Sequence, residues 1–309
     1  MNSLRVALQD YLSMRRDLGF KLQKDGKCLL KFVTFLEQQN APYITTRLGL
    51  EWAQQTVSTS GWQWQRLRMV RAFAKYRSAA DSRTEIPPST LLPRLRHRAR
   101  PYIYTEDEIQ RLLDAVIKRT FRNDFNAQTY YCLLGLLAVA GLRSGEAIRL
   151  KCEDVDLING VLVIRGTKFG KSRLVPLHPS TQKVLRDYQK RRESYLAGRP
   201  VAHFFISGRG TPILQSEIYR IFNSLSVQIG LRCPSAKGGP RPHDFRHRFA
   251  VHTLLRWYRS GLEIEPRLPL LSTFLGHVCI TSTYWYLTAY PELMGLAVKR
   301  LERRWGEKP

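Results

Sequence analysis

The chain has 309 residues, which is enough for two domains of ordinary size. Hydrophobic residues make up 43%, a normal share for a folded protein, and this excludes general disorder. The charge is unusual, because 50 lysines and arginines stand against 25 aspartates and glutamates, for a net charge of +25. The basic excess is spread over both halves of the chain and therefore indicates a partner that carries many phosphates.

Composition also argues against a membrane protein and against a zinc protein. The longest apolar run covers residues 131–142. It is too short to span a bilayer and predicts a buried core helix instead. The five cysteines are scattered, odd in number and without paired metal-ligand spacing. We expect a protein of the reducing cytoplasm that binds no membrane, metal or cofactor.

Residues 1–82 are expected to form an all-helical domain. Apolar residues recur there at helical spacing, as in residues 29–36, and Thr45 or Thr46 is expected to cap a third helix. A fourth helix is predicted over residues 62–78. One side of it is apolar, and the other is predicted to carry five basic residues: Arg66, Arg68, Arg71, Lys75 and Arg77. Such a face is usually only solvated, but in so basic a chain it favours a surface that contacts phosphates.

The helical pattern stops between residues 83 and 103. Four prolines interrupt any helix there, at positions 87, 88, 93 and 101. Arginines alternate with other residues at positions 94, 96, 98 and 100. We expect a basic linker whose arginines either lie along a DNA backbone or are simply solvated.

Residues 104–309 are predicted to form a second domain that is mostly helical. It begins with a capping box from Thr105 to Glu108, and its core helix ends before Gly141. The apolar period then changes to two, which predicts short strands at residues 155–157, 161–164 and 173–177. Helices return after residues 179 and 215. The predicted fold class is mainly α with a small antiparallel β-sheet: a helical N-terminal domain plus an α+β second domain.

The last quarter of the chain holds the residues that suggest chemistry. His243, Arg246, His277 and Tyr286 fall in or next to predicted helices. Arginine binds a phosphate through two parallel hydrogen bonds, histidine moves a proton near neutral pH, and tyrosine is an oxygen nucleophile. Each of these residues taken alone is more often an ordinary polar residue of a helix. Together they indicate chemistry on a phosphodiester.

Cleavage of a phosphodiester by a tyrosine also needs a second cation and an acid for the departing oxygen. Arg143 is the natural second cation, because it stands at a helix start after a glycine. Glu146 either caps that helix or holds the arginine. Lys168, at a predicted hairpin tip, is the candidate acid, with Lys171 as its rival. No cluster of carboxylates suited to a metal ion is present in the sequence.

These segments, in this order and spacing, resemble the tyrosine recombinase (phage integrase) family. The resemblance covers the second domain from about residue 104 onward, and residues 1–82 look like the helical, SAM-like core-binding domain of that family. The matching segments are Gly141-Leu142-Arg143-Ser-Gly-Glu146, the Lys168 hairpin ending in Arg173-Leu-Val-Pro176, His243-Asp-Phe-Arg246-His247, Leu275-Gly276-His277, and Tyr286.

The resemblance implies a role for each matching residue. Tyr286 would attack the scissile phosphate and form a 3′-phosphotyrosyl link. Arg143 and Arg246 would hold the non-bridging oxygens, and His277 would hydrogen-bond the same phosphate. His243 would act as the general base or share that role, and Lys168 would protonate the leaving 5′ oxygen. The partners implied are double-stranded DNA and further recombinase subunits in a homo- or hetero-tetramer, in a bacterial cytoplasm at the nucleoid.

Several alternatives stay open at this point. The chain could be a DNA-binding protein that has lost catalysis, or a relaxing enzyme similar to type IB topoisomerases. Its size resembles Xer proteins, whereas residues 285–294 resemble transposon-borne recombinases acting in integration, excision or transposition. An apolar stripe near the C-terminus either packs on its own domain or docks on a neighbouring subunit: Met294, Val298, Leu301 and Trp305. His247 is expected to be a packing residue of its helix.

Overall fold

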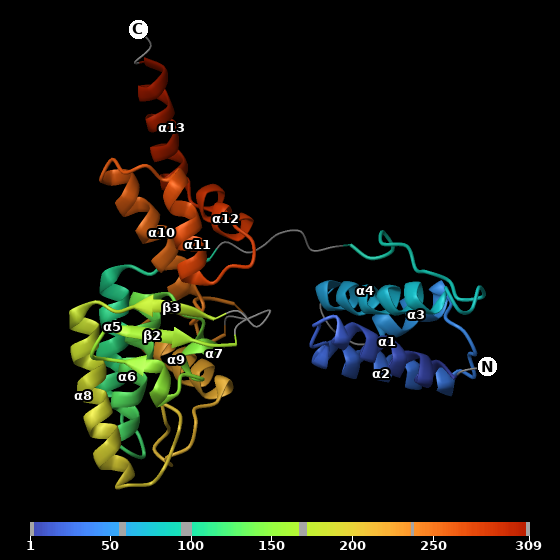
Figure 1. Cartoon of the computed structure of the whole chain (residues 1–309), viewed down its shortest axis with the longest axis horizontal. Helices are drawn as coiled ribbons and strands as arrows, with labels where there is room; N and C mark the ends of the chain where they lie inside the picture. Colours follow the sequence, from blue (N-terminus) through green and yellow to red (C-terminus); the bar gives the residue numbers. More distant parts are fainter. Residues whose placement is uncertain (1–2, 56–59, 94–100, 167–171, 236–237, 307–309) are drawn as a thin grey trace. The chain divides into compact units, whose positions relative to one another are not determined.

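The computed structural model describes residues 3–55, 60–93, 101–166, 172–235 and 238–306 (Figure 1). The chain divides into two compact units, Met1–Ala99 and Arg100–Pro309. The arginines predicted along the linker, at positions 94, 96, 98 and 100, lie outside the described residues, as do Lys168 and Lys171.

The described part of the first unit is helical, as predicted. It contains α1 (Leu4–Asp17), α2 (Gln23–Gln38), α3 (Thr46–Gln54) and α4 (Ser60–Arg77). Thr45 caps α3, because its side chain accepts a hydrogen bond from the backbone N–H of Leu48 at 3.2 Å. The helices enclose one apolar core whose innermost members are Phe32, Val33, Leu36, Trp52, Val70 and Phe73.

The basic face of α4 differs from its prediction at one residue. Arg66 is only 6% exposed, and its guanidinium lies 3.7 Å from the ring centroid of Trp52. A planar guanidinium stacks on an indole and so tolerates a position that an ammonium would not. The prediction that Arg66 belongs to an exposed basic face that contacts phosphates was therefore wrong. The exposed basic residues of the helix are Arg68, Arg71 and Lys75.

The first part of the expected linker is packed against the first unit. Glu85 accepts a hydrogen bond from the backbone N–H of Thr46 at 2.7 Å, at the start of α3. Leu92 is buried in a small apolar cluster with Leu67 of α4. Residues 83–92 therefore pack against α3 and α4 and do not form a free connection.

The second unit combines helices with one small antiparallel sheet, which confirms the predicted fold class. In chain order its described elements are α5 (Glu106–Lys118), α6 (Phe125–Ala140), α7 (Ser144–Ala147), η1 (Cys152–Asp154), β1 (Val155–Asp156), β2 (Val161–Ile164), β3 (Arg173–Pro176), α8 (Pro179–Leu196), α9 (Gln215–Gln228), α10 (Asp244–Arg259), η3 (Glu265–Arg267), α11 (Leu268–Leu275), α12 (Thr281–Ala289) and α13 (Pro291–Gly306). The strand order is β1-β2-β3, with Leu162 opposite Val175.

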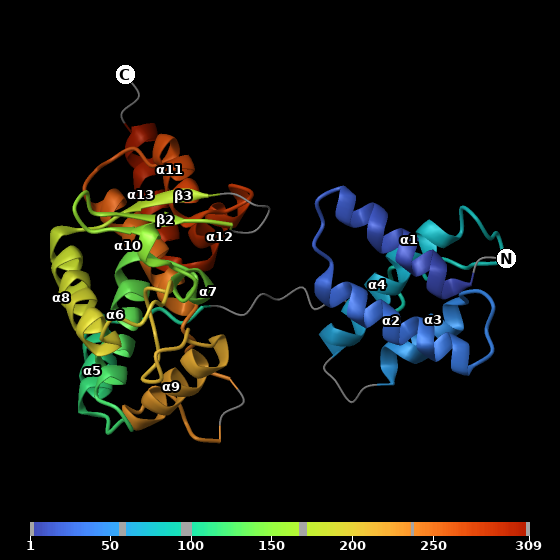
Figure 2. The same cartoon turned by 60° about the horizontal axis from the view of Figure 1, so that its bottom comes forward.

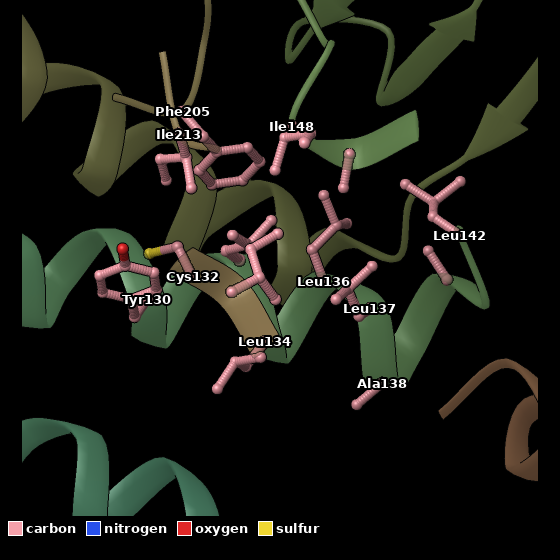
Figure 3. Packing of buried hydrophobic residues seen from close by; sticks show 14 of the residues in the cluster. Tyr130, Cys132, Leu134, Leu136, Leu137, Ala138, Leu142, Ile148, Phe205 and Ile213 are labelled. Carbon is pink, nitrogen blue, oxygen red and sulfur yellow. The ribbon is translucent and has the colours of Figure 1, made fainter. Parts of the chain in front are cut away.

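Helix α6 is the centre of this unit, and α5, α8 and α10 pack around it. It is apolar on all sides, and Leu133 and Leu137 are fully buried. Figure 3 shows its side chains together with those of Phe205 and Ile213. The predicted core helix is thus confirmed. Among the described residues, none of the helices has the length and apolar character that crossing a bilayer requires.

The last four helices form a second apolar cluster beyond the β3 edge of the sheet (Figures 1 and 2). Helix α11 contacts β3, and α10 contacts both α12 and α13. Tyr286 of α12 and Leu293 of α13 are buried in this cluster. The first turn of α10 and the ends of α6 and α11 are brought together where the two clusters of the unit meet.

Candidate active site

Arg246 lies at the centre of the candidate site. It is in the first turn of α10 and is 1% exposed. Its Nη1 donates to the carbonyl oxygen of Gly141 at 3.0 Å, and its Nη2 donates to the carbonyl oxygen of Leu275. Burial, followed by the charge of Arg143, lowers the pKa of Arg246 to about 9, whereas the nearby Tyr286 raises it. Arg246 is therefore a buried cation within electrostatic reach of two other predicted site residues.

The two carbonyls that bind Arg246 belong to helix ends. Gly141 follows α6 with φ +58°, and Gly276 follows Leu275 of α11 with φ +66°. Such left-handed positions favour glycine, and the carbonyls of a helix C-terminus attract a cation. A side chain at position 141 would also meet the ring of Phe249 at 2.7 Å. The glycine break in the sequence thus serves to present backbone oxygens to Arg246.

Arg143 stands beside this centre, directly before α7. Its Nη1 donates to Oε1 of Glu146 at 2.7 Å, and its Nη2 donates to the carbonyl oxygen of Gly276 at 3.0 Å. Its side chain is 32% exposed, which makes it far more accessible than Arg246. Arg143 therefore extends the positive charge of the site toward solvent.

Glu146 has both of the functions that the sequence left open, and a third that it did not indicate. It accepts a hydrogen bond from the backbone N–H of Arg143 at 3.1 Å and holds that arginine's side chain. It also binds Arg173 of β3, whose Nη2 lies 2.8 Å from Oε2. Arg173 in turn donates to the carbonyl oxygen of Phe274 at 2.7 Å. One buried carboxylate thus ties the sheet, α7 and the end of α11 together.

Glu146 should make the stability of the second unit depend on acidity. Burial raises the pKa of Glu146, but the hydrogen bonds and charges of Arg173 and Arg143 outweigh burial and lower it from 4.5 to about 2. A depressed folded-state pKa stabilises the fold above pH 4.5, and this contribution is lost as the pH falls toward 2. Its size is on the order of 3 kcal/mol.

Denaturant unfolding of the wild-type protein and the Glu146→Gln variant between these pH values measures this contribution. The stability difference between the two proteins is expected to shrink as the pH falls, because the wild-type carboxylate becomes neutral as well. A difference that stays constant across this pH range would contradict the assignment to Glu146.

His277 lies one residue beyond the glycine that ends α11. Its Nδ1 is 2.8 Å from Oγ1 of Thr283, which is fully buried in α12. A hydrogen bond at one ring nitrogen orients a histidine and selects its tautomer. The His277 ring stacks with that of Tyr286, with 6.1 Å between the centroids. Thr283 therefore connects the orientation of His277 to the helix that carries the tyrosine.

Tyr286 is 2% exposed, and its hydroxyl oxygen lies 3.0 Å from Nδ1 of His247. His247, which the sequence suggested only for packing, is itself 4% exposed. His243 contacts the same ring, since its centroid lies 4.9 Å from that of His247 in an edge-on arrangement. Trp285 packs beside both Tyr286 and His247.

The structure thus brings together five of the six predicted site residues: Arg143, His243, Arg246, His277 and Tyr286. The sixth, Lys168, lies outside the described residues, and so does its rival Lys171. Sequence reasoning missed Arg173, Thr283 and the contact of His247 with the tyrosine. The spacing of four between His243 and His247 signals a shared helix face. Within the described part of the chain, no group of three or more His, Cys, Asp or Glu side chains is arranged to bind a metal ion.

Comparison with known proteins gives the site its context. The profile of the phage integrase family matches residues 103–292. The protein y4rB of Sinorhizobium fredii, described as a candidate integrase/recombinase, is 52% identical over 313 residues and covers 100% of both chains.

Two solved structures share the fold. The Tn1549 transposon integrase in complex with transposon right end DNA has a TM-score of 0.68 at 17% identity, over 97% of this chain and 99% of that one. A lambda integrase tetramer bound to a Holliday junction has a TM-score of 0.63 at 18% identity, over 91% and 79%. Because the family profile covers more than half of the sequence, the chain belongs to the phage integrase family, the tyrosine recombinases.

Proposed function

We propose that the protein is a site-specific DNA recombinase that cleaves and rejoins strands through a covalent link between Tyr286 and a 3′ phosphate. The observation that carries this proposal is that two arginines and a buried tyrosine meet at the end of α11. Arg246 binds the carbonyl oxygen of Leu275, Arg143 binds that of Gly276, and the ring of the next residue, His277, stacks with that of Tyr286. A nucleophile beside two cations is the minimum arrangement for attack on a phosphodiester.

The two arginines bind the scissile phosphate in this proposal. Each guanidinium has five N–H donors, and two hydrogen bonds to protein oxygens hold each of them in place. Cations fixed in this way do not need to reorganise when negative charge develops on the non-bridging oxygens. His277, oriented by Thr283, donates a further hydrogen bond to the same phosphate. The phosphate enters from the side of Arg143, the more exposed arginine.

Cleavage exchanges one phosphoester for another. The oxygen of Tyr286 attacks phosphorus, the bond from phosphorus to the 5′ oxygen breaks, and Lys168 supplies the proton that the leaving oxygen needs. His243 takes part in removing the tyrosine proton, since its ring contacts His247 beside the hydroxyl. The phosphotyrosyl link keeps the energy of the original bond, so a 5′ hydroxyl from another strand reverses the reaction without a nucleotide cofactor.

The rest of the chain serves DNA binding and assembly. Residues 1–82 act as the core-binding domain, 83–103 as a linker whose first part packs on that domain, and 104–309 as the catalytic domain, in the bacterial cytoplasm at the nucleoid. The exposed basic residues of α4 contact the backbone of double-stranded DNA. On α13 an apolar face is open to solvent and docks on a neighbouring subunit in a tetramer: Met294, Val298, Leu301 and Trp305.

The biological role that fits best is integration, excision or transposition of a mobile element. What supports this role is the similarity over the whole chain to y4rB.

Capture of a covalent complex tests the proposed activity. The protein is incubated with a pool of duplexes that have a randomised core and a nick, so that the fragment beyond the cut diffuses away and the adduct persists. Adducts are isolated under denaturing conditions, amplified and sequenced over several rounds. Enrichment of a shared sequence is expected, and we call it the captured duplex. A pool that never forms an adduct would overturn the activity and favour a DNA-binding protein without catalysis.

The contact between Thr283 and His277 gives a quantitative prediction about the rate of cleavage. Thr283→Val removes the hydroxyl and keeps the shape of the side chain, so His277 loses its orienting partner. We expect the rate of adduct formation on the captured duplex to fall about tenfold, equivalent to about 1.4 kcal/mol. Thr283→Ser, which keeps the hydroxyl, should restore most of the rate. Equal rates for the valine and serine variants would show that the hydroxyl does not position His277.

A further inference from the structure

We propose that His247 is a catalytic residue, the direct acceptor of the proton that leaves the Tyr286 hydroxyl. This inference rests on the proposed function and names the group that activates its nucleophile. The geometry that carries it is the 3.0 Å separation between the hydroxyl oxygen of Tyr286 and Nδ1 of His247.

Both members of this pair are removed from water. Tyr286 is 2% exposed and His247 is 4% exposed. A phenol ionises with a pKa of about 10, so at neutral pH its attack on phosphorus needs a base within hydrogen-bond reach. Because solvent is largely excluded, that base must come from the protein. The imidazole of His247 belongs to the protein and lies within hydrogen-bond reach of the hydroxyl, so it can be this base.

The packing around the pair holds this geometry. His247 lies one helical turn after His243 on α10, and the two rings meet edge to face at 4.9 Å and 89°. On the other side, the indole of Trp285 lies 5.6 Å from the His247 ring. These contacts restrict the rotation of the imidazole, so Nδ1 stays directed at the tyrosine. His243 then affects the proton transfer through its contact with His247.

The electrostatic surroundings favour transfer together with attack. Among the described residues, the titratable and charged groups around Tyr286 and Arg246 include His243 and His247 on α10, His277 between α11 and α12, and the cluster of Arg143, Glu146 and Arg173. Positive charge on Arg246 stabilises the negative charge that develops on the phenol oxygen as its proton leaves. A bound phosphate offsets the arginine charge. Loss of the phenol proton and attack on the bound phosphate are therefore expected to occur together.

The proposed step is balanced in atoms and charge. The Tyr286 proton moves to Nδ1 of neutral His247, the oxygen–phosphorus bond forms, and the bond to the 5′ oxygen breaks with a proton from the general acid. When the strands rejoin, the 5′ hydroxyl attacks the phosphotyrosine and gives its proton back to the general acid, while His247 returns its proton to the tyrosine oxygen. One imidazole thus serves both directions and ends in its starting state.

Single-turnover adduct formation on the captured duplex tests the assignment. His247→Asn keeps a polar atom near the position of Nδ1 but cannot take up a proton, and His247→Ala removes both functions. We expect both variants to react about 10²–10⁴-fold more slowly than the wild-type protein. The wild-type rate should level off above the pH at which the acceptor is neutral. The rates of the variants should keep rising with pH, as hydroxide ionises the phenol.

A second substrate distinguishes activation of the nucleophile from assistance to the leaving group. In this duplex a sulfur atom replaces the 5′ bridging oxygen at the cleavage position, and a thiolate leaves without a protonating acid. A His247 variant should stay slow on this substrate, because its defect lies in the attacking oxygen. Recovery of the wild-type rate on the sulfur substrate would overturn the proposal, and so would a wild-type rate for His247→Asn on the normal substrate.

Two controls keep the interpretation clear. Thermal melting of each protein variant and its binding to the captured duplex are measured. If His247→Ala unfolds at a lower temperature than the wild-type protein, the rate of His247→Asn is used to judge the proposal. His243→Asn is tested in parallel, and a larger defect there than in both His247 variants would transfer the role of acceptor to His243. Failure of the proposed function itself looks different, since the wild-type protein would then form no adduct with either substrate.

Discussion

Replacement of Tyr286 by phenylalanine is expected to abolish the covalent adduct while leaving the fold and the affinity for DNA nearly unchanged. The substitution removes a single oxygen atom, the proposed nucleophile, and keeps the ring contacts with Trp285 and His277. Loss of the hydrogen bond to His247 should lower the free energy of unfolding by about 1 kcal/mol. The measurements are denaturing gels of the reaction with the captured duplex, thermal melting and an equilibrium binding titration.

Tyr284 supplies a matched control from the same helix. It lies two residues before Tyr286 in α12 and is 45% exposed, so its ring points away from the buried site. Tyr284→Phe should form the adduct at the wild-type rate. Mass spectrometry of the wild-type adduct should locate the nucleotide on the peptide that contains Tyr286. An adduct that survives Tyr286→Phe would remove this residue from the role of nucleophile.

The second large effect is expected at Arg246. Lysine carries the same charge but cannot donate along the two directions that bind the carbonyl oxygens of Gly141 and Leu275. Arg246→Lys should therefore lower the free energy of unfolding by about 1.5–3 kcal/mol, the value of one charge-assisted hydrogen bond. The rate of adduct formation should fall about 10²–10³-fold, which is the usual effect of removing a fixed hydrogen-bond donor to an oxygen that becomes negatively charged in the transition state.

Comparison of Arg143→Lys with Arg246→Lys separates what an arginine contributes to the stability of the fold from what it contributes to the rate of cleavage. Arg143 is 32% exposed, against 1% for Arg246, so its loss should cost less stability. Its effect on adduct formation should nevertheless be of the same order, because both guanidinium groups bind the phosphate. Urea unfolding and single-turnover kinetics of the two variants provide the comparison. If both variants lose only stability and react normally at low temperature, neither arginine binds the phosphate.

Local patterns in the sequence predicted much of the fold. The apolar run before Gly141 predicted α6, the capping box at Thr105 predicted the start of α5, and the change to period two predicted β2 and β3. Each of these signals arises within a few residues, so the chain reveals it without tertiary information. The order of the short site segments likewise indicated which residues would converge.

Contacts between distant residues were beyond such patterns. Arg66 looked like a solvated residue because its partner Trp52 lies on a different helix. Arg173 looked like an ordinary strand residue, although it binds a carboxylate 27 positions away. His247 could be assigned to the buried face of α10, but its bond to Tyr286 joins residues 39 positions apart. The periodicity of apolar residues predicts which face of a helix or strand is buried. It does not predict which residues of other elements contact that face.

The positions of the carbonyls that hold the two arginines bear on how the protein is made. Arg246 binds the carbonyl of Leu275, and Arg143 binds that of Gly276, which is 133 positions further along the chain. On the ribosome, the early part of the chain emerges and begins to fold first. A nascent chain that ends before Leu275 lacks one of the two oxygens that hold each guanidinium group, and it also lacks the tyrosine. The capacity to break DNA therefore arises only after residues 1–286 have been synthesised, and these include both arginines and the basic helix α4.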